Sequence, residues 1–256
     1  MKKKNPYLSN PLIGLYSVWT GFWFIGWFLA LYPFMVICLQ HKDTKRYAHK
    51  LVRIWSRLFF AFGFLRFEVI SEQKLDPKQV YVFCANHFSY LDIPAFVKIL
   101  PNYFSFVGKS SIQKVPLFGY LYARLNILVD RSDRKSRTAT LAKSIRALQS
   151  KRSIIIFPEG GITSKTFPFM STPLKDGAFA MAIQQQVPIL PITFLNNYQL
   201  LDDENFALRP GIIRVRIHAP IETQGLTQED LPVLREQVFQ KIQQPLLDYH
   251  GVDLPQ

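Results

Sequence analysis

The chain has 256 residues, of which 48% are hydrophobic, and a formal net charge of +13. This composition excludes a disordered polymer, because such chains contain too few hydrophobic residues to form a core, and the length allows one sizeable domain or two small ones. The two cysteines, Cys38 and Cys84, form neither a disulfide framework nor a CxxC metal motif. We expect both thiols to be buried in a reduced protein that faces the cytosol.

The positive charge is concentrated in two segments. Residues 1–70 contain ten Lys and Arg against two Asp and Glu, a net +8, and residues 131–152 contain eight against one, a net +7. Residues 153–256 contain seven against eleven, a net −4. Since the basic N-terminal half is also the hydrophobic half, the pattern favours an anionic membrane surface over a nucleic-acid duplex as the partner.

The first hydrophobic segment runs from Leu12 to Leu39 without a charged residue. It is too long for the apolar region of a signal peptide, and as a helix it would measure about 42 Å against a hydrocarbon core of about 30 Å. Gly21, Gly26 and Pro33 offer positions for a bend. Basic residues stand on both sides, Lys2, Lys3 and Lys4 before the segment and Lys42, Lys45, Arg46 and Lys50 after it. A bent or re-entrant hairpin is therefore as well supported as a full crossing.

The stretch from Lys45 to Phe67 has the pattern of an interfacial helix. Its basic residues recur at helical spacing on one face, and aromatic and aliphatic residues occupy the rest: Arg46, Lys50, Arg53 and Arg57 against Leu51, Ile54, Trp55, Leu58 and Phe59. The alternative is an ordinary amphipathic helix on a soluble core. We expect residues 1–70 to be a membrane-anchoring region that holds the rest of the chain at the cytoplasmic side of the cell membrane.

From Val80 onward, short hydrophobic runs alternate with helical stretches. The predicted strands are Val80–Cys84, Tyr103–Val107, Ile127–Asp130, Ser153–Phe157, Ile189–Phe194 and Ile212–His218, and the predicted helices include Arg137–Ser150, Lys175–Gln186 and Gln228–Asp248. This alternation predicts an α/β domain over residues 71–256, with a largely parallel sheet flanked by helices. In such sheets the functional side chains lie in the loops that follow the strands.

The sequence "VFCANHFSYLDIP" places His87 and Asp92 directly after a predicted strand. A carboxylate at that spacing can bind one imidazole nitrogen and stabilise the imidazolium that forms when the other nitrogen accepts a proton. The pair is therefore a candidate general base. Asp92 also has the position of a helix N-cap, because Ile93 and Pro94 follow it, and the two roles are compatible.

The group that such a base would activate is not obvious in the protein itself. The chain contains no G-x-S-x-G motif, so Ser89 and Ser110 are unsupported as nucleophiles. The five histidines do not have metal-ligand spacing, and we expect no metal and no cofactor. A hydroxyl of the substrate is the remaining candidate for activation by His87.

A second informative stretch is "SIIIFPEGGITSK", residues 153–165. After the predicted strand, Glu159, Gly160 and Gly161 form a flexible turn whose backbone amides can approach an anionic or hydroxylated ligand closely. The alternative is that Glu159 is a solvated carboxylate in an ordinary turn.

Together these stretches closely resemble the glycerolipid acyltransferases of the 1-acylglycerol-3-phosphate acyltransferase type. "NHFSYLD" matches the first motif of that family, N-H-x4-D, and "FPEG" matches the third. Residues 107–132 resemble the second motif through Lys109, Pro116, Gly119 and Arg131, and residues 175–194 resemble the fourth through "KDG" and "VPILPI". The four motifs occur in the family's order and cover residues 82–194.

The resemblance implies transfer of a fatty acyl group from acyl-CoA or acyl-carrier protein to the hydroxyl of a lysolipid in a membrane. It implies that His87 deprotonates the hydroxyl, that Asp92 orients His87, and that Arg131 binds the acceptor's phosphate. It further implies substrate contacts from Asn86, Lys109, Gly119, Glu159, Gly160 and Lys175. The basic segment 131–152 would attract an anionic head group or a phosphorylated acyl carrier.

One position departs from the family's third motif. Its commonest form continues with Thr-Arg-Ser, whereas Gly161, Ile162 and Thr163 stand here. An isoleucine cannot contact a phosphate electrostatically, so either Arg131, Lys165 or Lys175 compensates or the acceptor has another head group, such as a lyso-aminolipid. A thioesterase or lipase, with water as the acceptor, is a further alternative.

Overall fold

The computed structural model describes residues 10–253, which form two compact units. The first unit combines the N-terminal residues through Glu68 with Phe88–Ile99 and Asn196–Arg214. The second contains Val69–His87, Leu100–Leu195 and the chain from Val215 onward. The first unit thus includes two segments that lie outside the N-terminal region 1–70 predicted from the sequence, and that boundary stays a prediction.

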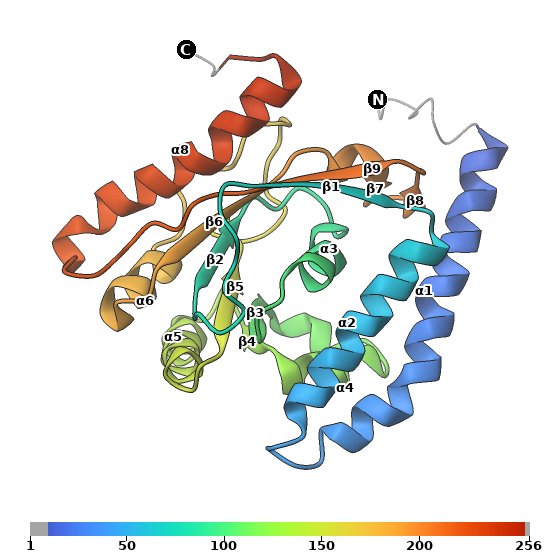
Figure 1. Ribbon diagram of the computed structural model, residues 1–256, viewed down its shortest axis with the longest axis horizontal. Helices are drawn as coiled ribbons and strands as arrows, with labels where there is room; N and C mark the ends of the chain where they lie inside the picture. Colours follow the sequence, from blue (N-terminus) through green and yellow to red (C-terminus); the bar gives the residue numbers. More distant parts are fainter. Residues whose placement is uncertain (1–9, 254–256) are drawn as a thin grey trace. The chain divides into compact units, whose positions relative to one another are not determined.

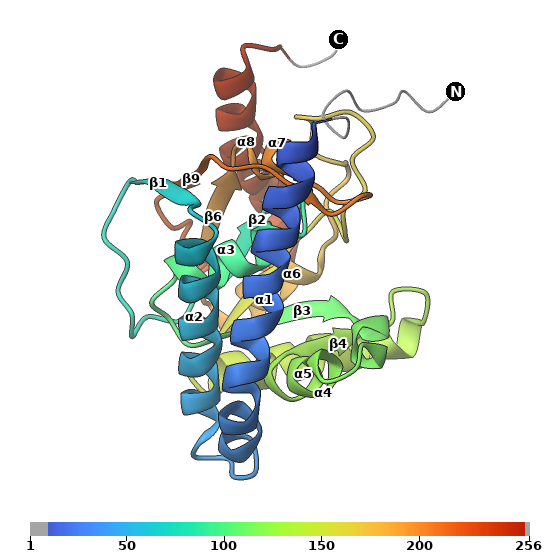
Figure 2. The same cartoon turned by 90° about the vertical axis from the view of Figure 1, so that its right-hand side faces the viewer.

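The first unit is built around two helices, α1 (Pro11–Cys38) and α2 (Lys45–Phe62), which lie side by side (Figures 1 and 2). The Asn10 side chain caps α1 by accepting a hydrogen bond from the Leu12 N–H at 3.0 Å. The helix continues through Pro33, so the hydrophobic segment does not form a hairpin within itself; the chain reverses after it and returns as α2. Among the described residues, α1 alone has the length and composition needed to cross a membrane. Lys2, Lys3 and Lys4 lie outside the described residues.

The contact between α1 and α2 is aromatic. The Trp55 indole N–H donates to the Phe24 carbonyl oxygen at 2.9 Å, and the Phe24 ring lies 4.7 Å from Trp55 and 5.1 Å from Phe59 between ring centroids. Trp55 and Phe59 are buried, whereas Arg57 is exposed, as the amphipathic pattern predicts. The predicted helix is too long at its end, because α2 stops before Gly63 and the chain starts a strand at Arg66.

Four short elements complete the first unit: α3 (Asp92–Ile99), α7 (Asn197–Leu200), β7 (Leu201–Asp202) and β8 (Ala207–Leu208). Helix α3 packs against α2, and the Ser56 hydroxyl of α2 donates to the Pro94 carbonyl oxygen at 2.7 Å. The N-cap pattern at Asp92 indicated the helix that α3 forms. The elements α7, β7 and β8 were not predicted, because two to four residues are too few for a helical or strand period to emerge.

The described residues contain a seven-stranded sheet with the order β1-β9-β6-β2-β5-β3-β4. Its strands are β1 (Arg66–Ser71), β2 (Val82–Ala85), β3 (Phe104–Lys109), β4 (Ile127–Val129), β5 (Ser153–Ile156), β6 (Ile189–Phe194) and β9 (Ile212–Ile217). The pairs from β6 to β4 are parallel, and β9 pairs with β6 antiparallel. The predicted largely parallel α/β sheet is therefore confirmed.

Helices connect and cover the strands of the second unit: α4 (Phe118–Leu125), α5 (Arg134–Gln149), α6 (Gly177–Gln185) and α8 (Leu231–His250). Short 3-10 turns occur at Ser110–Lys114 and Gln228–Asp230. Helix α5 packs on β4 and β5, α6 on β2, and α8 on β6 (Figure 1). The three predicted helices correspond to α5, α6 and the last helix, whereas α4 was not predicted.

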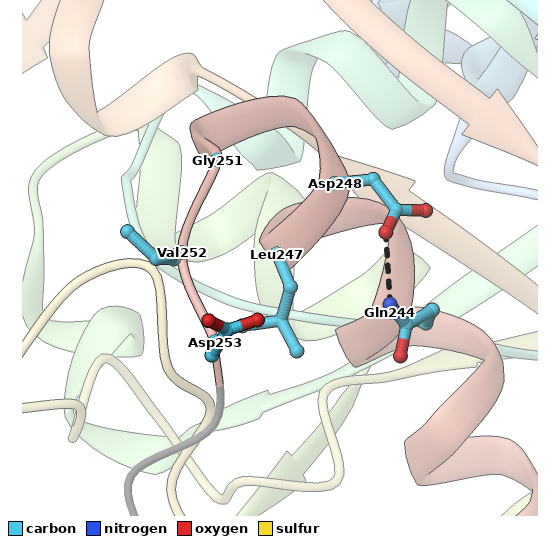
Figure 3. A pocket seen from close by; sticks show the side chains of 6 residues that line it. All are labelled: Gln244, Leu247, Asp248, Gly251, Val252 and Asp253. Carbon is cyan, nitrogen blue, oxygen red and sulfur yellow. Dashed lines mark hydrogen bonds between the residues drawn. The ribbon is translucent and has the colours of Figure 1, made fainter.

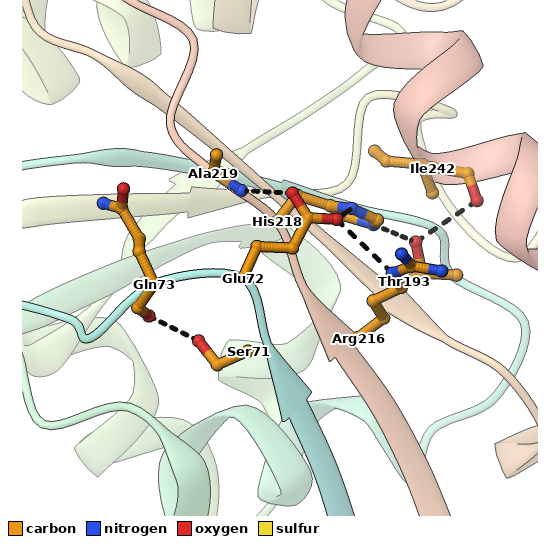
Figure 4. Close-up of polar contacts among 8 residues, drawn as sticks. All are labelled: Ser71, Glu72, Gln73, Thr193, Arg216, His218, Ala219 and Ile242. Carbon is orange, nitrogen blue, oxygen red and sulfur yellow. Dashed lines mark hydrogen bonds and ion pairs between the residues drawn. The ribbon is translucent and has the colours of Figure 1, made fainter.

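A buried polar cluster joins the end of β9 to β6 and α8 (Figure 4). His218 is 2% exposed; its Nδ1 lies 3.0 Å from Glu72 Oε1 and its Nε2 lies 2.9 Å from the Thr193 hydroxyl. Glu72 also accepts from the Ala219 N–H at 2.9 Å and pairs with Arg216. Thr193 is completely buried. The contacts among Glu72, His218 and Thr193 therefore have a structural role, which is to hold the end of β9 against β6.

Candidate active site

The predicted site residues of the second unit follow the carboxyl ends of neighbouring parallel strands. Asn86 and His87 follow β2, Glu159 follows β5 by three residues, and Arg131 follows β4 by two, while Lys109 is the last residue of β3. Because β2, β5, β3 and β4 are consecutive in the sheet, these side chains share one edge, as expected of an α/β fold.

Asn86 extends the pairing of β2 with β6 through its side chain. Its Nδ2 donates to the Phe194 carbonyl oxygen and its Oδ1 accepts from the Phe194 N–H, both at 2.9 Å. Asn86 is completely buried. A single amide thus satisfies both backbone groups of Phe194 and fixes the point at which the chain leaves the sheet for His87.

The His87 ring lies against Phe157. The two rings are nearly parallel, 13° apart, with their centroids separated by 3.9 Å, and only 7% of His87 is exposed. Phe157 follows the last residue of β5, and β5 is the neighbour of β2. The stacked ring covers one face of the imidazole and restricts its rotation.

Glu159 holds the backbone on both sides of the site. Its Oε1 accepts from the His87 N–H and its Oε2 from the Ser171 N–H, each at 2.8 Å. The β2–β5 register pairs Cys84 with Ile156, which brings His87 level with Glu159 three residues later. Because Glu159 is 4% exposed, it is not a solvated turn carboxylate, and that alternative is wrong.

The two glycines after Glu159 have backbone conformations that other residues rarely adopt, with φ of 86° at Gly160 and 146° at Gly161. A Cβ atom at Gly161 would lie 2.8 Å from Nη1 of Arg131, and one at Gly160 would lie 3.6 Å from Cγ of Lys175. Two cationic side chains therefore run beside the glycine turn. Such a turn with adjacent cations can bind an anion.

Arg131 is exposed as a whole residue, but neighbouring residues cover part of its guanidinium. Burial lowers the pKa of its guanidinium, and the Tyr122 hydroxyl beside it opposes this shift. Burial in turn raises the pKa of Tyr122 to about 12. At neutral pH Arg131 is therefore a cation next to a neutral phenol.

The remaining predicted residues of this unit occupy different environments. Lys109 is exposed at the end of β3, and Lys165 is exposed in the loop after the glycine turn, whereas Ile162 is half-buried. Gly119 is buried at the start of α4, where a Cβ atom would lie 2.3 Å from the Gln113 carbonyl oxygen. Gly119 is thus required by packing between α4 and the preceding 3-10 turn.

Asp92 belongs to the first unit, where it is the completely buried first residue of α3. Its Oδ2 accepts from the backbone N–H groups of Phe88 and Ser89, both at 3.1 Å, and its Oδ1 accepts from Asn197 Nδ2 at 2.7 Å. The carboxylate thus turns back toward the residues that precede the helix. Asp92 lies inside α3, one position later than an N-cap residue.

The hydroxyl of Ser89, a nucleophile candidate, is engaged elsewhere. It donates to Asp203 Oδ1 at 3.0 Å and accepts from the Leu91 N–H at 3.2 Å, and Ser89 is completely buried. Ser110 is half-buried at the start of a 3-10 turn. These environments do not support a serine nucleophile.

Two surface pockets of the second unit lie away from the predicted residues. One of about 350 Å³ lies at the C-terminal end of α8 (Figure 3), and its lining comprises Gln244, Leu247, Asp248, Gly251, Val252 and Asp253. Another, of about 370 Å³, is lined by residues that precede β2, β5 and β6, at the opposite edge of the sheet from His87. Within residues 10–253, no three His, Cys, Asp or Glu side chains gather as metal ligands.

The second unit is thus a largely parallel α/β sheet that carries, beyond the carboxyl ends of its strands, a buried histidine and a glycine turn flanked by two cationic side chains. The model of the family described as Acyltransferase matches residues 66–195, half of the chain. The chain belongs to the acyltransferase family.

Named relatives agree with this assignment. The 1-acyl-sn-glycerol-3-phosphate acyltransferase of Saccharomyces cerevisiae is 34% identical over 67% of this chain and 56% of its own length. The alpha enzyme of that name from Mus musculus is 28% identical over 83% of this chain and 75% of its own length. The chain therefore spans little more than half of the yeast relative.

A solved structure has the same fold. The crystal structure of the 1-acyl-sn-glycerophosphate acyltransferase from Thermotoga maritima superposes with a TM-score of 0.73 and 20% sequence identity, covering 97% of this chain and 99% of the other.

Proposed function

We propose that the protein transfers a fatty acyl group from a thioester to the hydroxyl of 1-acylglycerol-3-phosphate and so forms phosphatidate. The observation that carries this proposal is the glycine turn after Glu159, beside which the side chains of Arg131 and Lys175 run. Two cations at backbone amides match the charge and oxygen atoms of a phosphate monoester. The names of the relatives support the same acceptor.

In this mechanism His87 removes the proton from the acceptor hydroxyl while that oxygen attacks the thioester carbonyl carbon. The tetrahedral intermediate collapses as its C–S bond breaks, and the imidazolium returns the proton to the leaving thiolate. Asp92, five residues after His87, orients the ring and stabilises its charged form. The products are the new ester and the free thiol of CoA or of an acyl carrier protein.

The phosphate site compensates for the isoleucine at position 162. Arg131 and Lys175 both lie beside the glycines, so the site keeps two cations without an arginine in the turn itself. Asn86, Lys109, Glu159 and Gly160 complete the proposed machinery; Asn86 and Glu159 do so by holding the backbone around His87.

The N-terminal unit supplies the membrane attachment in this proposal. Helix α1 exposes large hydrophobic side chains along its length, among them Leu15, Phe22 and Leu29, and α2 exposes basic residues. Insertion of α1 into a bilayer that contains anionic lipids would bury the first set and pair the second with head groups. The acceptor's acyl tail then stays in the membrane during catalysis, with the second unit on the cytoplasmic side.

The decisive experiment is an acceptor panel with one labelled acyl-CoA. The purified protein in vesicles is supplied with 1-acylglycerol-3-phosphate, lysophosphatidylethanolamine, monoacylglycerol or no acceptor. We expect the phosphate monoester to be used best and thioester cleavage without acceptor to be slow. Equal use of monoacylglycerol would contradict the proposed acceptor, and rapid cleavage without acceptor would favour a thioesterase.

A second candidate acceptor is a lysolipid with an amine head group. Ile162 favours it because this side chain adds no cation to the loop after the glycines, and the phosphodiester of such a lysolipid carries less negative charge than a phosphate monoester. Faster transfer to lysophosphatidylethanolamine than to 1-acylglycerol-3-phosphate in the same panel would establish it.

A further inference from the structure

The C-terminal helix α8 carries a buried amide that none of the mechanistic roles uses. Gln243 is completely buried, and it lies outside residues 66–195, which match the family. Its Oε1 accepts from the Met170 N–H at 2.8 Å, and its Nε2 donates to the Pro168 carbonyl oxygen at 3.2 Å. One side chain thus binds a backbone donor and a backbone acceptor of a distant loop.

That loop comprises residues 158–175 and is called the site loop here. It starts after Phe157, contains the glycine turn, and closes where the Lys175 N–H donates to the Pro158 carbonyl oxygen at 2.7 Å. Loops of this length owe their conformation to their own contacts and to a few anchoring groups. Gln243 is such an anchor, and it comes from α8.

The anchored residue is next to one that the site itself holds. Ser171 follows Met170, and its N–H donates to Oε2 of Glu159, whose Oε1 accepts from the His87 N–H. The Ser171 hydroxyl also lies 2.9 Å from the Thr163 hydroxyl, two residues after Gly161. Hydrogen bonds linked by short stretches of backbone therefore run from α8 through the site loop to the residues beside the glycine turn and to the backbone of His87.

We propose that Gln243 is a positioning residue that sets the conformation of the site loop and thereby the affinity of the glycine turn for the acceptor's phosphate. The identity of the acceptor in this inference rests on the proposed function. The hydrogen bonds of Gln243 to Met170 and Pro168 are independent of that function. Without the amide, the Met170 N–H and the Pro168 carbonyl are buried without their partner, and a loop that moves to hydrate them carries Gly160 and Gly161 with it. The His87 backbone keeps its second anchor through Asn86.

The first test compares Gln243→Met, which keeps the length of the side chain but makes neither hydrogen bond, with Gln244→Met on the exposed side of the same helix. We expect Gln243→Met to raise the KM for 1-acylglycerol-3-phosphate about ten-fold or more, with little change in the KM for acyl-CoA. A fold that is merely less stable lowers the amount of active enzyme and hence kcat, but leaves KM unchanged. Gln244→Met should behave as the wild type.

The second test uses Gln243→Glu. A protonated glutamic acid supplies one acceptor and one donor, as glutamine does, whereas the ionised form loses the donor, and burial favours the protonated form. Neither β6 nor α6 contains a titratable residue. The titratable residues nearest to position 243 along α8 are Lys241 and Asp248, and those of the site loop are Glu159, Lys165 and Lys175. At each pH the KM of Gln243→Glu for the acceptor is divided by that of the wild type. This ratio should fall toward one as the pH is lowered.

Hydrogen exchange separates this inference from the proposed function. Amides of residues 158–175 should exchange faster in Gln243→Met than in wild type, and those of β2 should not change. If the wild type acylates no lysolipid, the proposed function fails, while the exchange measurement still decides the role of Gln243. Unchanged exchange in the site loop, or an unchanged acceptor KM in an active Gln243→Met enzyme, would overturn the inference.

Discussion

The carboxylate of Glu159 accepts a hydrogen bond from the backbone N–H of His87 at 2.8 Å, although 72 residues separate the two in the chain. Its second oxygen accepts from the Ser171 N–H. Glu159 therefore holds the backbone of His87 and that of the site loop at the same time. Both bonds use backbone N–H groups, which no substitution at positions 87 or 171 removes except proline.

Replacement of Glu159 by glutamine should lower kcat and the melting temperature together. The amide presents an NH2 group to one of the two backbone N–H donors, which leaves buried donors unpaired at a cost of about 1–3 kcal/mol. Steady-state kinetics and thermal unfolding of Glu159→Gln measure both effects. Glu229→Gln, a change in the 3-10 turn before α8, is the control for a lost negative charge. Full activity of Glu159→Gln would refute the positioning role.

Replacement of His87 by alanine should reduce acyl transfer by about a hundred-fold to ten thousand-fold, the usual contribution of a general base. Asp92→Asn should also reduce kcat, because a neutral amide stabilises an imidazolium less well than a carboxylate does. Both variants should bind vesicles as the wild type does, since α1 and α2 are unchanged. Turnover near the wild-type rate in His87→Ala would exclude the proposed mechanism.

Replacement of Arg131 by alanine should raise the KM for the phosphate-bearing acceptor by about 10-fold to 100-fold, the value of a charge-assisted hydrogen bond. Arg131→Lys keeps the charge but loses the planar fork, so its effect should be smaller. Arg134→Ala, also basic and exposed at the start of α5, is the matched control. If Arg134→Ala and Arg131→Ala weaken acceptor binding equally, the basic surface acts diffusely.

The buried cluster around His218 predicts loss of stability in acid. Burial lowers the pKa of His218 below its ordinary 6.5 and outweighs the neighbouring Glu72 carboxylate, which raises it. The unfolded chain therefore binds the proton more readily, so this contribution to stability is complete above about pH 6.5 and declines as the pH falls below it. The pKa of Glu72 is lowered in the fold: burial raises it, but hydrogen bonds from the Ala219 N–H and from His218 outweigh burial. Its stabilisation is likewise lost in acid.

Melting temperatures measured from about pH 7.5 down to about pH 5 test this prediction. The wild type should lose stability over that interval, and His218→Gln, which has no titrating ring, should show a shallower pH dependence. An unchanged slope in His218→Gln would show that other groups cause the acid sensitivity. His41→Gln, a change in the exposed turn after α1, is the control.

The sequence patterns predicted the parallel sheet well, because strands buried on both faces read as short hydrophobic runs between turns. Each of the six predicted strands begins or ends within one residue of the matching strand, β2, β3, β4, β5, β6 or β9, and the first of them begins two residues too early. Residues 66–71 were instead assigned in part to the preceding helix, since a largely exposed edge strand such as β1 lacks that signal.

The residues of the candidate site that belong to local sequence motifs were predictable, whereas contacts between residues far apart in the chain were not. His87, Glu159 and Arg131 are visible as polar residues after strands. The pairing of Asn86 with Phe194 joins residues 108 positions apart, and no local period reports it. Gln243 has the sequence signature of an exposed polar residue on an amphipathic helix.

Cys38 is half-buried and Cys84 completely buried, so the expectation of two buried thiols holds fully for the second.

The phenylalanine ring stacked on His87 also makes this histidine observable without substrate. Protons held above an aromatic ring are magnetically shielded, so the carbon-bound protons of this imidazole should resonate upfield of those of exposed histidines such as His41. The parallel stack at 3.9 Å also distinguishes His87 from His250, whose ring meets that of Tyr249 edge-on at 4.8 Å. The protonation of His87 can then be followed by NMR in an enzyme at rest, and Phe157→Leu should abolish the distinction.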